Sequence, residues 1–319
     1  MVLGILIVPA IAFGILAFYF TQVPVHPLGG PLFDWLYGAL SDSYLLLITG
    51  VFVNLTGAFL VNLLYNAHNY AERENYFPAL IYFLIASSQL SWEFLNPVIV
   101  GNVFVLLALR RILRMYRVQE ITSMIYDAGL FLSLGALFFP LLILAFPLLW
   151  FSLIQLRTFN LREWIVPFMG VSTPAIFAAV VFWWYDYTLD YSEFTTFSDQ
   201  PFREIFTFHG ALYYPLLIIS VFIFLAGLLT FLNDMTTSTV HKKNTKKVYV
   251  TTSIFLLGIY IYGIALSEIQ AGMLAVLAPP LAVFAGVYFS RSRRKKLRQA
   301  LFYIWILLLI VYPILESMR

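Results

Sequence analysis

Long apolar runs separated by short polar segments constrain the fold of this chain more than any motif does. A helix needs about 20 residues to cross about 30 Å of hydrocarbon. Runs of about this length are Met1–Phe20, Tyr44–Asn66, Trp164–Trp184, His209–Leu232, Val248–Leu266, Ala271–Ser290 and Ala300–Leu315, and shorter ones are Phe77–Leu90 and Pro97–Ile112. With 61% apolar and 11% charged residues, a soluble domain of this size would lack the charge to stay dissolved. The sequence therefore predicts an all-α transmembrane bundle and excludes a soluble enzyme.

The stretch from Asp127 to Leu156 is too long for one crossing, because as a single helix it would reach about 45 Å. Pro140 and Pro147 interrupt it, and proline inside a helix removes a hydrogen bond and favours a bend. We therefore predict a hairpin of two helices, Ile121–Phe139 and Leu141–Leu156. This interpretation gives about eleven membrane-spanning helices.

We place the N-terminus inside and let successive spans cross in alternating directions, which assigns each loop to one side of the membrane. The basic residues then fall mostly on the inner side. Of the 19 Lys and Arg residues, only Arg203 and Arg319 then fall outside, an asymmetry that the positive-inside rule predicts. Most acidic residues fall outside. The pattern predicts a multi-pass membrane protein with a cytoplasmic N-terminus and a C-terminus on the outer side; the family resemblance given below implies that this membrane is the bacterial inner membrane and that the outer side is the periplasm. Membrane lipids are expected partners of the inner basic clusters, and nucleic acid is not.

Two outer loops, residues 21–43 and 185–208, are long enough to hold structure. In the first, Pro31 suits the first position of a helix, and Leu32, Trp35, Leu36 and Leu40 recur at helical spacing, which predicts a short helix in the membrane interface. The second loop is acidic and aromatic. We expect residues 1–208 to form a membrane core that carries both loops, and residues 209–319 a C-terminal extension of four helices.

Three outer carboxylates are candidate catalytic groups. Asp34 and Asp42 lie in the first outer loop, and Glu93 lies in a neighbouring one. A carboxylate can act as the general base in chemistry at the membrane surface. Acids also populate outer loops simply because Lys and Arg are kept inside, and this alternative stays open. Asp34 is the strongest candidate, because apolar residues surround it in the sequence.

Four further residues are candidate contacts for a substrate. Arg203 is the only basic residue in an outer loop between spans, and it would either clamp a lipid-linked phosphate or pair with a neighbouring acid. His26 would join the same site or be solvated. Trp35 and Trp184 would line a groove for an isoprenoid chain or a sugar, although an interfacial aromatic belt explains Trp184 equally well.

Absences narrow the function further. The sequence has no Cys and only four scattered His, so we expect neither a metal site nor a cofactor. The middles of the predicted spans hold no Asp, Glu, Lys or Arg, which argues against an ion-coupled transporter. Asparagines such as Asn54, Asn62 and Asn102 do fall within spans. They would either bind neighbouring helices together or line a polar path.

The segments Leu95–Arg111, Tyr126–Pro140 and Arg157–Trp164 resemble an uncharacterised family of polytopic bacterial inner-membrane proteins. More distantly, the order of loops is similar to that of the GT-C glycosyltransferase superfamily. That resemblance implies that a sugar is taken from a polyprenyl-phosphate carrier at the outer face, with an outer-loop carboxylate as base. Here Asp34 does not follow the first span closely and is not part of a paired acidic motif, unlike the usual acid of that superfamily.

These observations lead to one hypothesis and two alternatives. The leading hypothesis is a GT-C-like protein of cell-envelope biogenesis that binds or transfers a polyprenyl-linked sugar, with Asp34 as the base. The first alternative is a non-enzymatic subunit that scaffolds a secretion, motility or envelope complex together with other inner-membrane proteins. The second is a flippase or carrier without ion coupling, which fits only the asparagines.

Overall fold

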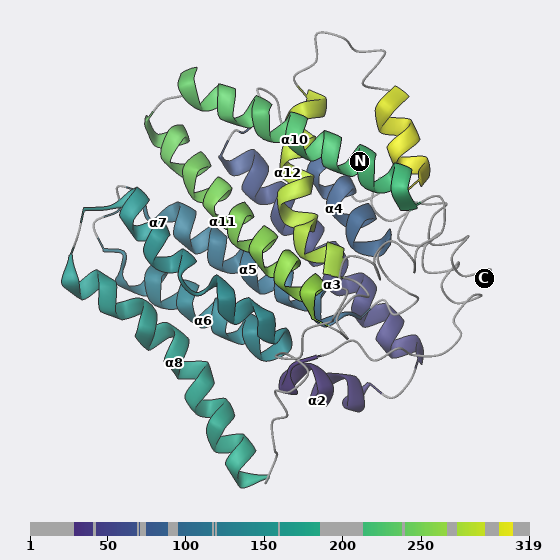
Figure 1. The fold of residues 1–319 in the computed structure, drawn as a ribbon. Coiled ribbons are helices and arrows are strands. Elements are labelled where there is room, and N and C mark those ends of the chain that lie inside the picture. Colours follow the sequence, from purple (N-terminus) through teal and green to yellow (C-terminus); the bar gives the residue numbers. More distant parts are fainter. Residues whose placement is uncertain are drawn as a thin grey trace.

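The computed structural model describes a bundle of helices (Figure 1). It covers residues 29–40, 43–68, 70, 75–88, 95–116, 118, 120–158, 160–185, 213–237, 240–266, 273–290 and 300–308. Five helices in this part of the chain are long and apolar enough to cross a membrane. They are α3 (Ser43–Ala67), α8 (Leu161–Trp184), α10 (Tyr213–Thr237), α11 (Val240–Ala265), and the pair formed by the 3₁₀ helix η3 (Met273–Leu277) and α12 (Ala278–Ser290). The chain is therefore a multi-pass helical membrane protein, as the apolar runs predict.

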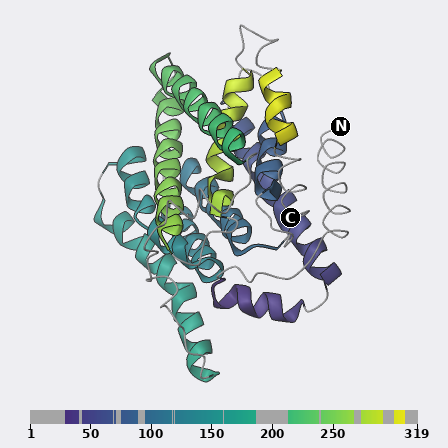
Figure 2. The ribbon, with the colours of Figure 1, turned by 45° about the vertical axis from the view of Figure 1, so that its right-hand side comes forward.

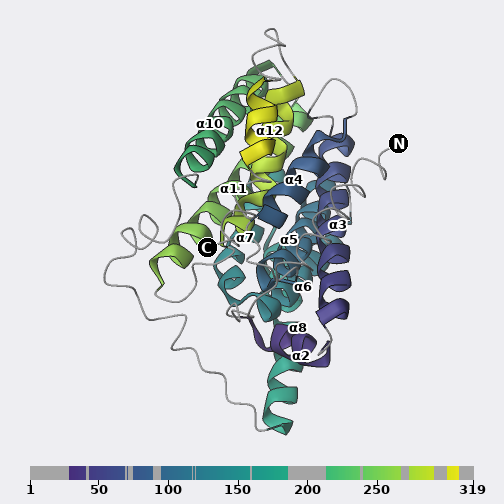
Figure 3. The same cartoon turned by 90° about the vertical axis from the view of Figure 1, so that its right-hand side faces the viewer.

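Shorter helices complete the bundle (Figure 3). They are α2 (Pro31–Ala39), α4 (Phe77–Ser88), α5 (Pro97–Arg114), α6 (Thr122–Phe138), the 3₁₀ helix η1 (Pro140–Ala145) and α7 (Leu148–Leu156). One end, which we call the basic end, holds the last turn of α5 and the first turns of α8 and α11, with their Arg and Lys residues. Helix α2 lies across the opposite end, which we call the α2 end (Figure 3).

Charge is segregated between these two ends. In the described part of the chain, Asp34 is the only Asp, Glu, Lys or Arg that does not lie at the basic end. The middles of the five helices that are long enough to cross a membrane carry none of these residues. Such segregation fits a bundle whose central layer is hydrocarbon, because a charged group at that depth is costly.

The predicted break near Pro140 is confirmed. Helix α6 ends at Phe138, η1 begins at Pro140, and α7 begins at Leu148, directly after Pro147. Phe139 adopts an extended backbone between the two helices. The chain turns here because neither proline can donate the backbone hydrogen bond that a continuous helix needs.

Helices α6 and α8 cross at very close range. A Cβ added to Gly129 would lie 2.8 Å from the carbonyl oxygen of Pro167, and one added to Gly170 would collide with the carbonyl oxygen of Tyr126. Small residues at such crossings let helix backbones approach, which is the main source of attraction between helices in lipid. The Tyr126 hydroxyl also donates to Thr173 Oγ1 at 2.9 Å and ties the same two helices together.

Helix α12 lies inside the bundle, and its residues from Ala278 to Tyr288 are buried. Because Pro279 and Pro280 have no N–H, the carbonyls of Ala275 and Val276 lose the donors that a continuous helix would supply. The Asn102 side chain donates to the Ala275 carbonyl at 2.7 Å. The expectation that asparagines bind helices together is thus confirmed here, and the 2.9 Å bond from Asn54 Nδ2 to Ser87 Oγ is a second case.

Candidate functional site

Helix α2 is held against the α2 end of α6. Its first residue is Pro31, as predicted, and Gly30 precedes it. The Gly30 N–H donates to the carbonyl of Phe138 at 2.8 Å. A Cβ at Gly30 would collide with the carbonyl oxygen of Leu137, so glycine allows this approach. The start of α2 is therefore fixed to the point where α6 ends.

Phe33 anchors the middle of α2. It is 2% exposed and forms a small buried cluster with Leu95 and Val100, against which Leu36, Tyr37 and Leu40 also pack. Trp35, by contrast, is 73% exposed. The short helix is confirmed, whereas the face that it packs is centred on Phe33 and does not include Trp35.

The position of Asp34 follows from this anchoring. Because Phe33 is turned into the bundle, Asp34 lies on an exposed part of α2, next to Trp35. It sits in the first turn, where the positive end of the helix dipole stabilises a carboxylate. The cluster also brings Leu95 against Phe33.

The other predicted site residues are placed as follows. His26, Asp42, Glu93 and Arg203 lie outside the described residues. Trp184 is the last residue of α8 and is 74% exposed. The last turns of α8 project beyond the rest of the bundle (Figures 1 and 2). Of the predicted residues, the structure thus brings together Asp34 and Trp35, which share α2.

A buried ion pair at the basic end is a feature that the sequence interpretation missed. Lys246 of α11 pairs with Asp234 of α10, and their side chains are 1% and 15% exposed. The Lys246 ammonium also lies 5.5 Å from the centre of the Phe231 ring, which adds a cation–π attraction. The predicted span Val248–Leu266 begins two residues after Lys246 and therefore left this lysine in a polar segment on the inner side.

Aromatic rings from several elements surround this ion pair. Tyr70, which follows α3, meets Phe231 of α10 and Tyr249 of α11 edge to face, with ring centres 5.3 and 5.8 Å apart. Phe284 of α12 also meets Phe231 edge to face. Burial raises the pKa of the Tyr70 hydroxyl above its ordinary range, and the Thr245 side chain beside it opposes this shift. The ion pair and its cage of rings therefore join α10 and α11 to α12 and to the end of α3.

A helical pattern in the sequence could have located Lys246. The buried residues of α11 recur at helical spacing as Lys246, Tyr249, Ser253 and Leu256. Lys243 and Lys247 lie off this stripe and are exposed. A lysine in register with a buried stripe on a spanning helix requires a partner, and Asp234 is the acid that precedes the turn between α10 and α11.

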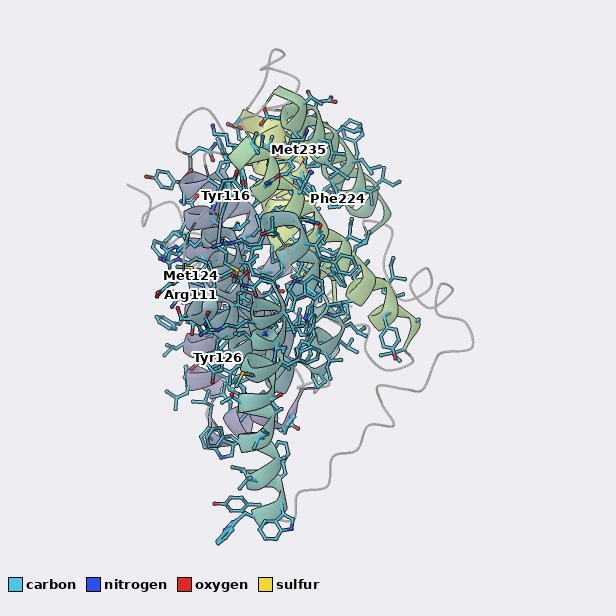
Figure 4. The ribbon with its side chains drawn as sticks, turned by 90° about the vertical axis from the view of Figure 1, so that its left-hand side faces the viewer. Arg111, Tyr116, Met124, Tyr126, Phe224 and Met235 are labelled. Atoms are coloured by element: carbon cyan, nitrogen blue, oxygen red, sulfur yellow. The ribbon has the colours of Figure 1, made fainter. Side chains whose placement is uncertain are left out.

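A second ion pair at the basic end is of the ordinary surface kind. Arg111 Nε lies 3.3 Å from Asp127 Oδ2, and the two side chains are 39% and 34% exposed. Figure 4 shows Arg111, Tyr116, Met124 and Tyr126 along one side of α5 and α6, with Phe224 and Met235 on α10. An exposed pair of this type contributes at most about 1 kcal/mol.

Comparison with known proteins gives one match. The model of a family of unknown function, DUF6427, matches residues 35–318. No curated protein and no solved structure matches the chain. The resemblance to an uncharacterised family is therefore confirmed, whereas the GT-C resemblance finds no support in these comparisons.

Proposed function

The chain belongs to DUF6427, a family of unknown function, and from its own residues we propose a function. We propose that the protein transfers a sugar from a polyprenyl-phosphate carrier at the α2 end. The observation that carries this proposal is the position of Asp34 at the α2 end. Asp34 is the one charged side chain away from the basic end in the described part of the chain, and it lies on a helix fixed across the bundle.

The chemistry of sugar transfer gives Asp34 its role. An acceptor hydroxyl attacks the anomeric carbon, the bond to the carrier phosphate breaks, and the hydroxyl proton goes to a carboxylate base. Asp34 is exposed and can meet an acceptor at the membrane surface. In this proposal Asp42 and Glu93 support the base, Arg203 clamps the carrier phosphate, and His26, Trp35 and Trp184 contact sugar or lipid. The proposal extends the resemblance to GT-C enzymes and places the protein in envelope biogenesis.

Asp34→Asn tests the proposal in proteoliposomes that contain a polyprenyl-phosphate sugar and a hydroxyl acceptor. Loss of a general base is expected to slow transfer about 100-fold or more. Glu163→Gln is the matched control, because Glu163 is a partly exposed acid in the first turn of α8 at the opposite end. Full transfer by the Asp34→Asn protein, or equal losses in the two variants, would remove the catalytic assignment. Equal melting temperatures of the two variants exclude a folding defect.

A scaffold role is the second candidate, and α8 favours it. This helix projects from the bundle (Figure 2), and Phe177, Val180 and Trp184 on its last turns are more than half exposed. A membrane partner that packs along these turns would be captured by crosslinking in native membranes and identified by mass spectrometry. On this alternative, Trp184→Ala weakens capture and Asp34→Asn leaves it unchanged. The enzyme proposal expects no such dependence on α8.

A further inference from the structure

Two side-chain nitrogens of Arg157 lack a hydrogen-bond acceptor in the described part of the chain. Arg157 follows the last residue of α7 and has an extended backbone. Its Nε and Nη2 atoms are buried and have no hydrogen-bond partner among the described residues. In a guanidinium group these two nitrogens form one edge of the planar fork, the edge that makes two parallel bonds to a carboxylate or phosphate. The missing partners are therefore a matched pair of acceptors.

Other polar atoms close to Arg157 in the sequence are unpaired as well. Ser152 Oγ and Gln155 Oε1 on the last turns of α7 are buried without a partner, and so is Nε of Arg110 in α5, at the same end of the bundle. A buried donor or acceptor left unpaired is costly, and a charged one more so. Such a concentration of unpaired groups at one end of the bundle indicates a polar ligand.

The depth of Arg157 identifies the kind of ligand. The apolar helix Pro140–Leu156 ends just before it, and the spanning helix Leu161–Trp184 begins just after it. Arg157 therefore lies where two apolar segments leave the hydrocarbon, which is the level of lipid headgroups. Arg110, Arg111, Arg114 and Arg162 add positive charge at this end, and such clusters attract anionic headgroups.

We propose that Arg157 binds a phosphate-bearing anion, supplied by a phospholipid headgroup or by free phosphate, and that Arg110 contributes a second guanidinium. Two phosphate oxygens accept from Nε and Nη2 of Arg157. Arg157 as a whole is only partly buried, so an anion at the membrane surface can reach its guanidinium group. This site lies at the basic end, opposite Asp34, so it stands independently of the sugar-transfer proposal.

Arg111, which follows Arg110 in α5, provides a matched control. It is also an arginine at the basic end, but its Nε is already paired with Asp127 at 3.3 Å. Arg157→Gln removes the unpaired fork, Arg157→Lys keeps the charge without the fork, and Arg111→Gln removes a fork that is in use. Only the first two variants are expected to lose the anion.

The test uses the full chain in a neutral detergent and measures its melting temperature. The added probes are short-chain phosphatidylglycerol, inorganic phosphate, and octanoate as a carboxylate anion. We expect phosphatidylglycerol to stabilise the native and Arg111→Gln proteins. Arg157→Gln should bind it about ten- to a hundredfold more weakly, the loss expected for hydrogen bonds to a charged group. Arg157→Lys should fall between them, because Lys is a point charge.

A second measurement separates this role from a purely structural one. Without any added anion, Arg157→Gln should melt no lower than the native protein, because it removes a partly buried guanidinium group whose Nε and Nη2 have no hydrogen-bond partner among the described residues. Stabilisation by inorganic phosphate alone would support the site and assign it to free phosphate, whereas a response only to phosphatidylglycerol assigns it to lipid. The proposal is overturned if octanoate stabilises as well as phosphatidylglycerol, if Arg157→Gln keeps the full response, or if Arg157→Gln melts lower without anions.

Discussion

Lys246→Met tests whether the buried ion pair holds α10 and α11 in place. Methionine keeps the volume of the lysine stem, so the change creates no large cavity. It leaves the Asp234 carboxylate, 15% exposed, without its cation. Breaking a buried pair in this way costs about 3–5 kcal/mol. Because Asp234 keeps some contact with solvent, and because the cation–π contact with Phe231 is lost too, we expect a loss of about 3–4 kcal/mol.

The double variant Lys246→Met/Asp234→Leu separates the two contributions to this loss. Replacing both charges by apolar groups of similar size removes the unpaired carboxylate as well as the attraction, which is often nearly neutral. We therefore expect the double variant to recover to within about 1 kcal/mol of the native protein. Lys243→Met is the control, because Lys243 is exposed on the same helix, and it should change stability by less than about 0.5 kcal/mol.

Unfolding in mixed micelles, titrated with a denaturing detergent, measures all four proteins on one scale. The reasoning fails if Lys246→Met costs less than about 1 kcal/mol, since the carboxylate would then have found water or another partner. It also fails if the double variant is as unstable as the single one. In that case the loss would reflect packing among the aromatic rings and not the unpaired charge.

Two further predictions concern backbone approach and the docking of α2. Gly170→Ala should lower the free energy of unfolding by about 2 kcal/mol, because the new methyl group collides with the backbone of α6. Gly258→Ala, with open space around it, should be neutral or slightly stabilising, and equal losses in the two variants would contradict the close crossing. Phe33→Ala should cost about 3 kcal/mol and speed hydrogen exchange of the α2 amides, while exchange in α5 and α6 stays slow. Uniformly faster exchange would mean that Phe33 supports the whole bundle.

Proline and charge made much of this fold predictable. Pro31 and Pro140 fixed where a helix starts and where one breaks, because a missing N–H acts locally and needs no knowledge of tertiary contacts. The alternation of basic clusters anticipated that charges gather at one end of the bundle. Asparagines within spans anticipated bonds between helices, since an unpaired amide in hydrocarbon is costly.

The packed faces were harder to predict. On α2, residues on almost every side are apolar, so helical spacing could not show whether Trp35 or Phe33 packs against the bundle. Phe33 is buried because it contacts Leu95 and Val100. For Lys246, a position near a helix terminus suggested solvent. Its burial depends on Tyr70 and Phe231, which come from distant parts of the chain. Tertiary contacts of this kind leave little trace in local sequence.

The double proline at the start of α12 has a consequence for assembly. A helix entering a bilayer normally satisfies its backbone by itself, but this segment relies on donors from other helices. The Asn102 side chain of α5 donates to the Ala275 carbonyl, which has lost its helical donor, and the Tyr249 hydroxyl of α11 adds a bond to the Pro279 carbonyl. Alone in lipid, residues 273–290 would expose bare carbonyls to hydrocarbon. We therefore expect this segment to become stable in the bilayer only after α5 is in place.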